Sequence, residues 1–378
     1  MRLLFAIKQL SSAVGGAERV LCTVCSELVA RGHDITIITF DGPGGQPFYP
    51  LDGRIKRIDL AIGNSKRNAR LAETLRRGPA LRHAVMEESP QVAVGFMHSM
   101  FVPLAVAMAG TGIPVVGSEH IVPEHYRTRP AQYALLIAAA SFLAKVTVLS
   151  ESIRIRYPTP LRKRMIVMPN PVVPATGQAD PGAKKARYVL LNIGRLDAQK
   201  DHATLLRAFA RIATAYPDWE LRIIGNGPLR RELEILVHDL GLEERVRMPG
   251  IKADIGVEYC AADAFVISSR YEAFGLVTAE AMSHGLPAVG FADCSGTNEL
   301  IQDGSTGLLA AAGPDRTMSL SHELERVMSE PDLRRRLGVA AKSAIGQRFS
   351  AEHVCNLWES LLESVCVEPG LARPSALQ

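Results

Sequence analysis

The sequence lacks any segment suited to enter or cross a membrane. Only five apolar residues, Leu3 to Ile7, stand between Arg2 and Lys8, too few for the apolar region of a signal peptide. The longest apolar stretch, residues 133–144, is closed by Lys145 and falls well short of the ~20 residues that a membrane span requires. We therefore expect a cytoplasmic chain that starts at Met1 and crosses no bilayer.

Metal and cofactor motifs are missing as well. The chain has no Asp-x-Asp, no GxxxxGK[ST] phosphate loop, no GxSxG elbow and no HExxH. Its six cysteines are scattered, and the one CxxC, Cys22 to Cys25, has no partner pair, so buried thiols are favoured over disulfides or metal ligands. We expect no metal, no cofactor and no nucleic acid as a partner.

What the sequence has is a regular alternation of strands and helices. Short β-branched or apolar runs are separated by helical patterns such as those at residues 17–31, 203–215 and 229–240, which is typical of βαβ units and parallel sheets. The predicted strands are residues 3–7, 35–40, 92–96, 115–118, 145–149 and 165–168, then 188–193, 221–224, 246–248, 264–267 and 288–291.

At 378 residues the chain exceeds what one hydrophobic core usually organises. We predict an α/β protein of two facing Rossmann-like, doubly wound domains with a cleft between them. The expected divisions are a first domain at 1–170, a Pro/Gly-rich linker at 171–186, a second domain at 187–350, a helix packing back on the body at 351–367 and a tail at 368–378.

The segment 268–285, SSRYEAFGLVTAEAMSHG, contains the strongest candidate site. It follows a predicted strand and opens into a helix, so that its turn would offer unpaired backbone N–H groups to an anion. These amides belong to Phe274, Gly275, Leu276 and Val277. Glu272 and Glu280 flank the turn and could accept hydrogen bonds from sugar and ribose hydroxyls. Alone, they fit a solvated loop charge and a first-turn glutamate equally well.

Other candidates follow other strands. Arg195 and Lys200 leave a strand-end turn where two cations could hold a diphosphate, although solvated loop cations are common. Gly15 and Gly16 precede the first helix and leave room for a ligand near the backbone. His120 ends a first-domain strand, with His125 and Glu124 as open alternatives.

The charge is unevenly distributed. Residues 1–170 carry 21 Lys and Arg against 12 Asp and Glu, although the whole chain has a net charge of only +4. The cations gather in segments 66–83 and 154–164. They could bind an anionic membrane face or could equally be solvated helix faces.

Six segments taken together resemble family 4 of the glycosyltransferases, which has the GT-B fold. They are GGAERV, GSEH, GRLDAQK, IIGNGPLR, EAFGLVTAE and DCSGTNELIQDGSTGLL, in that order over residues 1 to 350. The resemblance implies a nucleoside diphosphate sugar donor and retention of the anomeric configuration. It also implies that Glu272 contacts the transferred sugar, Glu280 the ribose, and Arg195 and Lys200 the diphosphate.

The same resemblance carries the family's histidine onto His120 and its N-terminal Gly pair onto Gly15 and Gly16. It implies front-face substitution, in which the leaving phosphate accepts the acceptor's proton. Many members have Gly where this chain has Ala273, so the donor sugar stays open. The family's surface-polysaccharide enzymes commonly use lipid-linked acceptors.

We therefore predict a metal-independent, retaining transferase that moves a hexose or N-acetylhexosamine from a UDP-sugar to a polysaccharide or polyprenyl-linked glycan. We expect it at the inner face of the membrane, held by its basic first domain. Two alternatives stay open, a nucleotide-sugar-binding protein without turnover and a transferase acting on a soluble small molecule.

Overall fold

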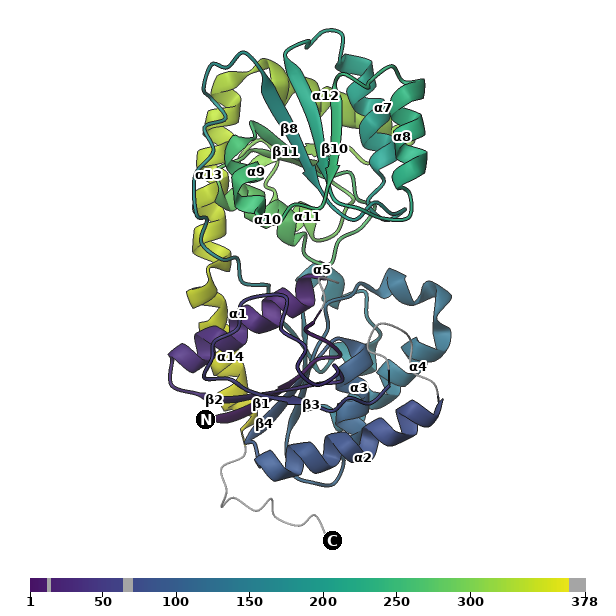
Figure 1. Ribbon diagram of the computed structural model, residues 1–378, viewed down its shortest axis with the longest axis vertical. Helices are drawn as coiled ribbons and strands as arrows, with labels where there is room; N and C mark the ends of the chain where they lie inside the picture. The colour runs from purple at the N-terminus through teal and green to yellow at the C-terminus, as the bar shows by residue number, and fades with distance from the viewer. Residues whose placement is uncertain (12–14, 64–70, 367–378) are drawn as a thin grey trace. The chain divides into compact units, whose positions relative to one another are not determined.

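A computed structural model of the chain describes residues 1–11, 15–63 and 71–366 (Figure 1). The chain forms two compact units, and each is built on one parallel β-sheet. Unit 1 combines Met1–Pro171 with the C-terminal segment that begins at Ala351, and unit 2 spans Val172–Ser350. The predicted α/β class, with two doubly wound Rossmann-like sheets, is confirmed.

The sheet of unit 1 has the order β3-β2-β1-β4-β5-β6-β7, with every neighbouring pair parallel. Its strands are β1 (Arg2–Ala6), β2 (Asp34–Thr39), β3 (Lys56–Asp59), β4 (Val92–Phe96), β5 (Val115–Ser118), β6 (Lys145–Val148) and β7 (Met165–Val167). The prediction missed β3, because the sequence Lys-Arg-Ile-Asp has neither an apolar run nor a clear alternation.

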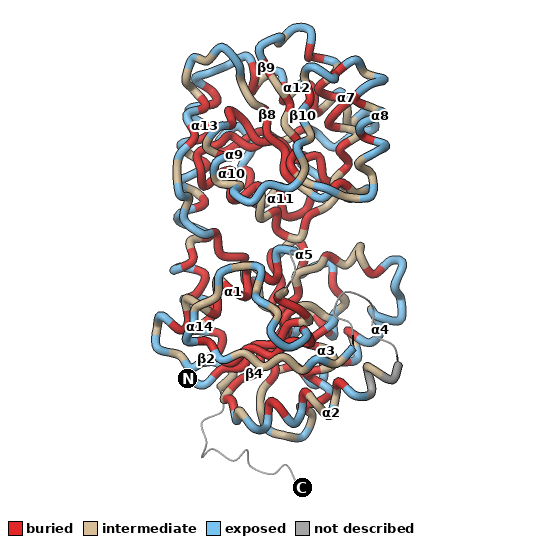
Figure 2. The backbone as a smooth tube through the Cα atoms, in the orientation of Figure 1, coloured by how far each residue is buried: buried red, intermediate tan, exposed pale blue. Residues whose placement is uncertain are grey.

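Helices cover this sheet. They are α1 (Gly16–Ala30), α2 (Leu71–Glu88), α3 (His98–Ala107), α4 (Pro130–Ala139), α5 (Glu151–Arg154), α6 (Thr159–Arg162) and α14 (Ala351–Val365), with 3-10 turns η1 (Pro123–Thr128) and η2 (Ala140–Phe142). The last helix, α14, packs against α1, and buried positions recur along it (Figure 2). The ring of Trp358 in α14 meets that of Phe5 edge-on and stacks on that of Phe96. The C-terminal helix is thus part of the core of unit 1.

The sheet of unit 2 has the order β10-β9-β8-β11-β12-β13 and is also parallel throughout. Its strands are β8 (Tyr188–Ile193), β9 (Trp219–Ile224), β10 (Val246–Gly250), β11 (Ala264–Val266), β12 (Ala288–Phe291) and β13 (Gly307–Ala310). The prediction missed β13, a four-residue strand that begins at a glycine.

The helices of unit 2 are α7 (His202–Ile212), α8 (Arg230–Asp239), α9 (Ile255–Ala261), α10 (Leu276–Ser283), α11 (Thr297–Leu300), α12 (Arg316–Ser329) and α13 (Pro331–Phe349). The segment predicted as a linker, residues 171–186, runs along this unit. Ala179 donates its N–H to His284 O at 2.8 Å, and the buried guanidinium of Arg334 donates to Pro181 O at 2.7 Å.

The strand orders show where ligands can bind. In unit 1, β1 lies between β2 and β4, and in unit 2, β8 lies between β9 and β11. Connections leave such a central strand and its neighbour toward opposite faces, which opens a crevice at the carboxyl ends of the two strands. The glycine pair at residues 15–16 follows β1, the basic loop 194–201 follows β8, and Glu272 follows β11.

The loop after β5 is held by the buried carboxylate of Glu119. Its Oε2 accepts a hydrogen bond from Tyr126 Oη at 2.8 Å, and its Oε1 accepts one from the N–H of Ile121 at 3.1 Å. Burial raises the pKa of Glu119 to about 8, because the charged form would lose its hydration. Since His120 is the next residue, these bonds position the predicted histidine.

Replacing Glu119 with glutamine is expected to change how stability depends on pH. The folded-state pKa of about 8 lies above the ordinary value of 4.5, so the carboxyl's contribution is complete below the lower value and is lost as the pH rises through the higher one. The glutamine of Glu119→Gln does not titrate, so the variant lacks this loss of stability. As the pH rises through this window, the free energy of unfolding of the variant should therefore increase relative to that of the parent chain, by up to about 1.4 kcal/mol per pH unit. Urea unfolding over the same window measures this slope. The exposed Glu87→Gln is the matched control, and a pH-independent difference for Glu119→Gln would contradict the burial argument.

Candidate functional site

Two loops at the carboxyl end of the unit 2 sheet are hydrogen-bonded to each other. One follows β8 and the other follows the neighbouring strand β11. Gln199 Nε2 donates to Tyr271 O at 2.9 Å, the N–H of Arg270 donates to Gln199 O at 2.9 Å, and Ser268 Oγ donates to Lys200 O at 2.8 Å. These hydrogen bonds pair backbone N–H and C=O groups that have no partner in a helix or strand. They also join the two loops to each other.

Glu272 lies where these loops meet. Lys200 Nζ is 2.6 Å from Glu272 Oε1, and Ser269 Oγ donates to the same oxygen at 2.5 Å. Glu272 is 7% exposed and Ser269 is fully buried, so the carboxylate has lost most of its water and depends on these donors. Within the part of the chain that the structure describes, Oε1 receives both donors and Oε2 receives none. Oε1 of Glu272 is therefore held by its two donors, and Oε2 is available to accept a hydrogen bond from a ligand.

The backbone of Glu272 is fixed from a third loop, which follows β12. The N–H of Glu272 donates to Ser295 O at 3.0 Å, and Ser295 Oγ donates back to Glu272 O at 3.2 Å. Next to it, Gly296 has a φ of +79°, and a Cβ at that position would lie 2.8 Å from Glu272 O. Only glycine suits both the left-handed backbone and the close approach.

The predicted anion-binding turn lies at the start of α10. Gly275 is the N-cap residue, with a φ of +84°, and its carbonyl accepts from the N–H groups of Thr278 and Ala279. The N–H groups of Leu276 and Val277 thus stand at the first helical positions, where a helix has no internal acceptors for them. The ring of Phe274 is buried and packs edge-on against Phe349.

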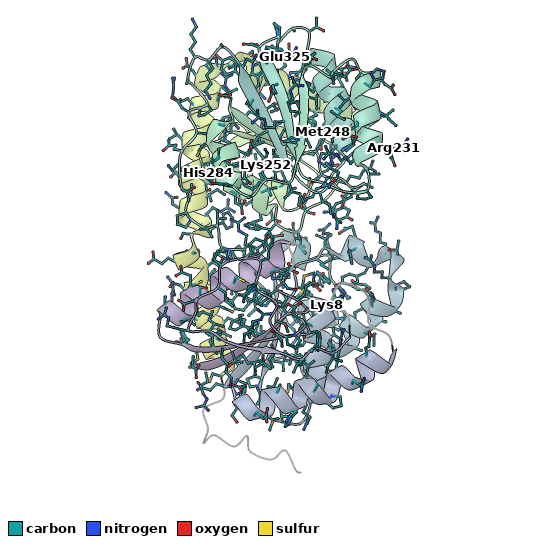
Figure 3. All side chains as sticks on the ribbon, in the orientation of Figure 1. Lys8, Arg231, Met248, Lys252, His284 and Glu325 are labelled. Atoms are coloured by element: carbon teal, nitrogen blue, oxygen red, sulfur yellow. The ribbon has the colours of Figure 1, made fainter. Side chains whose placement is uncertain are left out.

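Glu280 lies in the second turn of α10 and not in its first, so dipole stabilisation of a first-turn glutamate does not account for it. It is 6% exposed, and its Oε2 accepts a hydrogen bond from Tyr259 Oη of α9 at 3.1 Å. His284, labelled in Figure 3, places its Nδ1 2.8 Å from Glu280 O. The centroid of its ring lies 4.9 Å from that of Tyr259. Glu280 is therefore a held carboxylate, as Glu272 is.

The two predicted cations have different surroundings. Lys200 is largely buried against Glu272, with its side chain 18% exposed, whereas the side chain of Arg195 is 66% exposed. Arg195 pairs with Asp197 at 2.5 Å. The other oxygen of Asp197 accepts the N–H groups of Gln199 and Lys200 and so shapes the same loop.

The candidates of unit 1 lie after β1 and β5. Gly15 is the N-cap of α1, Gly16 begins that helix, and both are exposed. The ring of His120 stacks on Phe96 with centroids 5.1 Å apart, and its Nε2 lies 3.0 Å from Ser118 Oγ. Burial lowers the pKa of His120 to about 4, so the imidazole is neutral near pH 7.

The alternatives to His120 lie in η1. His125 contacts Arg129, and the carboxylate of Glu124 pairs with Arg156 at 2.7 Å. Burial and the nearby Arg129 lower the pKa of His125. Both residues are thus engaged with cations of the surface.

Sequence reasoning missed three residues that hold candidate side chains or their loops, one in unit 1 and two in unit 2. Ser269 precedes Glu272 by three positions in the same turn, and Glu119 adjoins His120, so sequence proximity was the available signal. Tyr259 lies on another helix and had no such signal. All three are buried and hydrogen-bond to a candidate residue or its loop.

Part of the basic segment 66–83, which was predicted as one half of a membrane-binding surface, lies in α2. Lys66, Arg67 and Arg70 lie outside the described residues. Arg77 is buried, with its guanidinium 4.1 Å from the centre of the Phe40 ring, and it donates to Ile62 O. Arg82 donates to Ala107 O at 2.7 Å. Arg77 and Arg82 therefore each bind a backbone carbonyl of unit 1, and membrane binding by segments 66–83 and 154–164 stays a prediction.

No group of three or more His, Cys, Asp or Glu side chains is arranged to hold a metal ion in the described part of the chain. Among the helices described, none combines the length and apolarity needed to cross a bilayer.

Comparison with known proteins places both units in one class of enzyme. Residues 14–176 match the family model for Glycosyltransferase Family 4, and residues 176–344 match the model for Glycosyl transferases group 1. Over 367 residues the chain is 27% identical to the Campylobacter jejuni GalNAc-alpha-(1->4)-GalNAc-alpha-(1->3)-diNAcBac-PP-undecaprenol alpha-1,4-N-acetyl-D-galactosaminyltransferase, covering 97% of this chain and 99% of that protein.

Solved structures share the fold. Sucrose-phosphate synthase from Thermosynechococcus elongatus has a TM-score of 0.81 at 20% identity, over 97% of this chain and 99% of that one. Anabaena Alr3699/HepE in complex with UDP-glucose has a TM-score of 0.74 at 20% identity, over 96% and 100%. Since the two family models together run from residue 14 to residue 344 and the fold agrees, the chain belongs to glycosyltransferase family 4.

Proposed function

We propose that this glycosyltransferase moves a hexose or N-acetylhexosamine from a UDP-sugar to a lipid-linked or polysaccharide glycan, with retention of configuration and without a metal ion. The observation that carries the proposal is the carboxylate of Glu272, held through Oε1 by Lys200 and Ser269 with Oε2 offered. A carboxylate oriented in this way can accept a hydrogen bond from a sugar hydroxyl.

The donor assignment is supported by two features. The N–H groups at the start of α10 carry partial positive charge, and the ammonium of Lys200, near Glu272, carries a full one. Both can attract the negative oxygens of a diphosphate. HepE, which shares the fold, was solved with UDP-glucose. Glu280, held by Tyr259, is proposed to accept the ribose hydroxyls, and Arg195 to approach the diphosphate from its exposed position.

The acceptor assignment is supported by the Campylobacter relative, which matches nearly the whole chain and is named for an undecaprenyl-diphosphate glycan. An acceptor of that kind would bring the enzyme to the inner face of the cell membrane. Gly15, Gly16 and His120 are proposed to contribute from unit 1, with His120 acting as a neutral hydrogen-bonding imidazole.

In the proposed reaction, the bond between sugar C1 and the leaving phosphate oxygen breaks while the acceptor oxygen bonds to C1 on the same face. The acceptor proton passes to that phosphate oxygen, so atoms and charges balance and UDP leaves. Negative charge grows on the diphosphate as the bond breaks, where fixed N–H groups and a cation stabilise it most. Glu272 orients the sugar and stabilises positive charge near C1, and it forms no bond to the sugar.

A donor panel tests the proposed function. The chain is incubated with UDP-glucose, UDP-galactose and their N-acetylated counterparts, together with a polyprenyl-diphosphate disaccharide, and the product is examined by NMR. Transfer from the α-linked donor into an α-linkage with release of UDP is expected. UDP binding without transfer or hydrolysis would establish the binding-protein alternative instead, and a β-linked product would refute retention.

Glu272→Gln is expected to slow transfer while sparing UDP binding. The amide is isosteric, but it carries no charge and cannot serve both Lys200 and the sugar as the carboxylate does. A loss of about 10²–10³ in kcat is expected from removing one oriented electrostatic group, with the Kd for UDP, from calorimetry, changed by less than about threefold. Glu258→Gln, which changes a carboxylate paired with Arg222 in the same unit, is the matched control. A near-normal kcat in Glu272→Gln would refute the assignment.

Ser269→Ala tests whether the buried hydroxyl positions Glu272. Loss of one hydrogen bond to a charged group corresponds to about a ten- to hundredfold fall in kcat, with KM nearly unchanged. Ser269→Thr keeps the hydroxyl and should restore much of the rate. Ser321→Ala removes a buried hydroxyl from α12 and serves as control. Equal rates for Ser269→Ala and the parent chain would show that Lys200 alone suffices.

A further inference from the structure

The two cations of the candidate diphosphate site each have a carboxylate partner. Lys200 pairs with Glu272 at 2.6 Å, and Arg195 pairs with Asp197 at 2.5 Å. Two positive and two negative side chains therefore balance where the diphosphate of the donor is proposed to bind. While both cations are neutralised in this way, a diphosphate gains little net attraction from them.

Burial distinguishes the two ion pairs. The side chains of Lys200 and Glu272 are 18% and 9% exposed, so separating them would leave two charges with little water around them. The side chain of Arg195 is 66% exposed, whereas that of Asp197 is 14% exposed. An exposed guanidinium loses little when it leaves its partner, because water takes the partner's place. The pair of Arg195 and Asp197 is therefore the one that can open.

The carboxylate of Asp197 keeps hydrogen-bond donors when Arg195 leaves it. Its Oδ2 accepts a hydrogen bond from Arg195 Nε at 2.6 Å. Its Oδ1 accepts the N–H groups of Gln199 at 3.1 Å and Lys200 at 3.3 Å. Because these backbone donors stay in place, departure of the guanidinium does not leave the largely buried charge without a partner.

The residues on either side of Arg195 are held by the loop that follows the neighbouring strand β9. Gly194 donates its N–H to Ile224 O at 3.0 Å. A Cβ at Gly227 would lie 2.3 Å from Leu196 O, so the two backbones are in direct contact. With its backbone fixed in this way, Arg195 can change partner by moving its side chain alone.

We propose that Asp197 is a positioning residue that binds the guanidinium of Arg195 in the free enzyme and releases it to the diphosphate of the donor. The inference rests on the proposed function, in which Arg195 meets that diphosphate. A guanidinium binds phosphate oxygens through parallel N–H bonds, and a diphosphate carries more charge than one carboxylate, so it displaces Asp197. When UDP leaves, Asp197 takes Arg195 back. This competition lowers the affinity for UDP and speeds its release.

Asp197→Asn separates the two roles of this side chain. The amide oxygen can still accept the N–H groups of Gln199 and Lys200, but the charge that competes for Arg195 is gone. The variant should therefore bind UDP about two- to fivefold more tightly than the parent chain, the range expected for one exposed ion pair. It should release UDP correspondingly more slowly. Calorimetry measures the Kd, and stopped-flow displacement measures the rate of release.

Three controls isolate the exchange. Uridine has no phosphate, so its Kd should be the same for Asp197→Asn and the parent chain. Asp332→Asn removes the same charge from another exposed pair of unit 2, that with Arg335 at 3.1 Å, and should bind UDP as the parent does. In an Arg195→Ala background, Asp197→Asn should lose most of its effect, because no guanidinium is left to release.

NMR of the parent chain tests the exchange without altering Asp197. The Nε–H signal of Arg195 is assigned by its absence from the spectrum of Arg195→Lys. Since this N–H group donates to Asp197 in the free enzyme, its signal should shift when UDP is added and stay in place when uridine is added.

The sign of the affinity change decides between this account and a purely structural one. A carboxylate that only shaped the loop would leave the UDP affinity of Asp197→Asn unchanged or weaker, and either result would overturn the proposal. An equal gain for uridine, for Asp332→Asn or in the Arg195→Ala background would also overturn it, as would an Arg195 signal that UDP does not move.

Failure of the proposed function would look different. Absence of UDP binding in every variant, the parent chain included, would overturn the proposed donor and the exchange together. UDP binding by the parent chain that Asp197→Asn leaves unchanged would overturn the exchange alone.

Discussion

The two loops of the candidate site in unit 2 are organised around the desolvated ion pair between Lys200 and Glu272. Two nearly buried charges are costly unless each has a partner, and removing either one would leave the other uncompensated. The loops after β8 and β11 are joined by hydrogen bonds around this pair, and Ser269 adds a second donor to the same oxygen of Glu272. The constraint that stabilises the loops therefore also fixes the direction of the carboxylate. In our account, structure and catalysis share this interaction, because the oxygen left without a donor is the one that meets the sugar.

Unit 1 uses a related arrangement with a different charge state. Glu119 is also a carboxyl at a strand end, but its partners are Tyr126 and a backbone N–H, and burial raises its pKa to about 8. Burial disfavours the charged form of the carboxyl, so its neutral form is the stable one at pH 7. It fixes the loop that carries His120 and, through the stack of Tyr126 on Tyr133, helix α4.

The sequence was sufficient for the parts of the structure that follow periodic patterns. Alternation of apolar runs and helical segments predicted eleven of the thirteen described strands in nearly their observed positions. The motifs that contain Lys200 and Glu272 lie on adjoining loops of the structure, where the two side chains form an ion pair. Prediction from the sequence failed where contacts between distant parts of the chain determine the structure. Strand β3 is charged and pairs only at the sheet edge, and Arg77 reads as a solvated helix cation but packs on the Phe40 ring. Tyr259 reaches Glu280 from another helix, a contact that no local spacing reveals.

The most direct test of the central claim is a crystal structure of the chain with an intact UDP-sugar. The account predicts that a hydroxyl of the sugar lies within hydrogen-bonding distance of Glu272 Oε2, while Lys200 and Ser269 remain on Oε1 and the diphosphate oxygens meet the N–H groups of Leu276 and Val277. A sugar bound away from Glu272, or a Glu272 side chain turned so that Oε1 leaves Ser269, would contradict it.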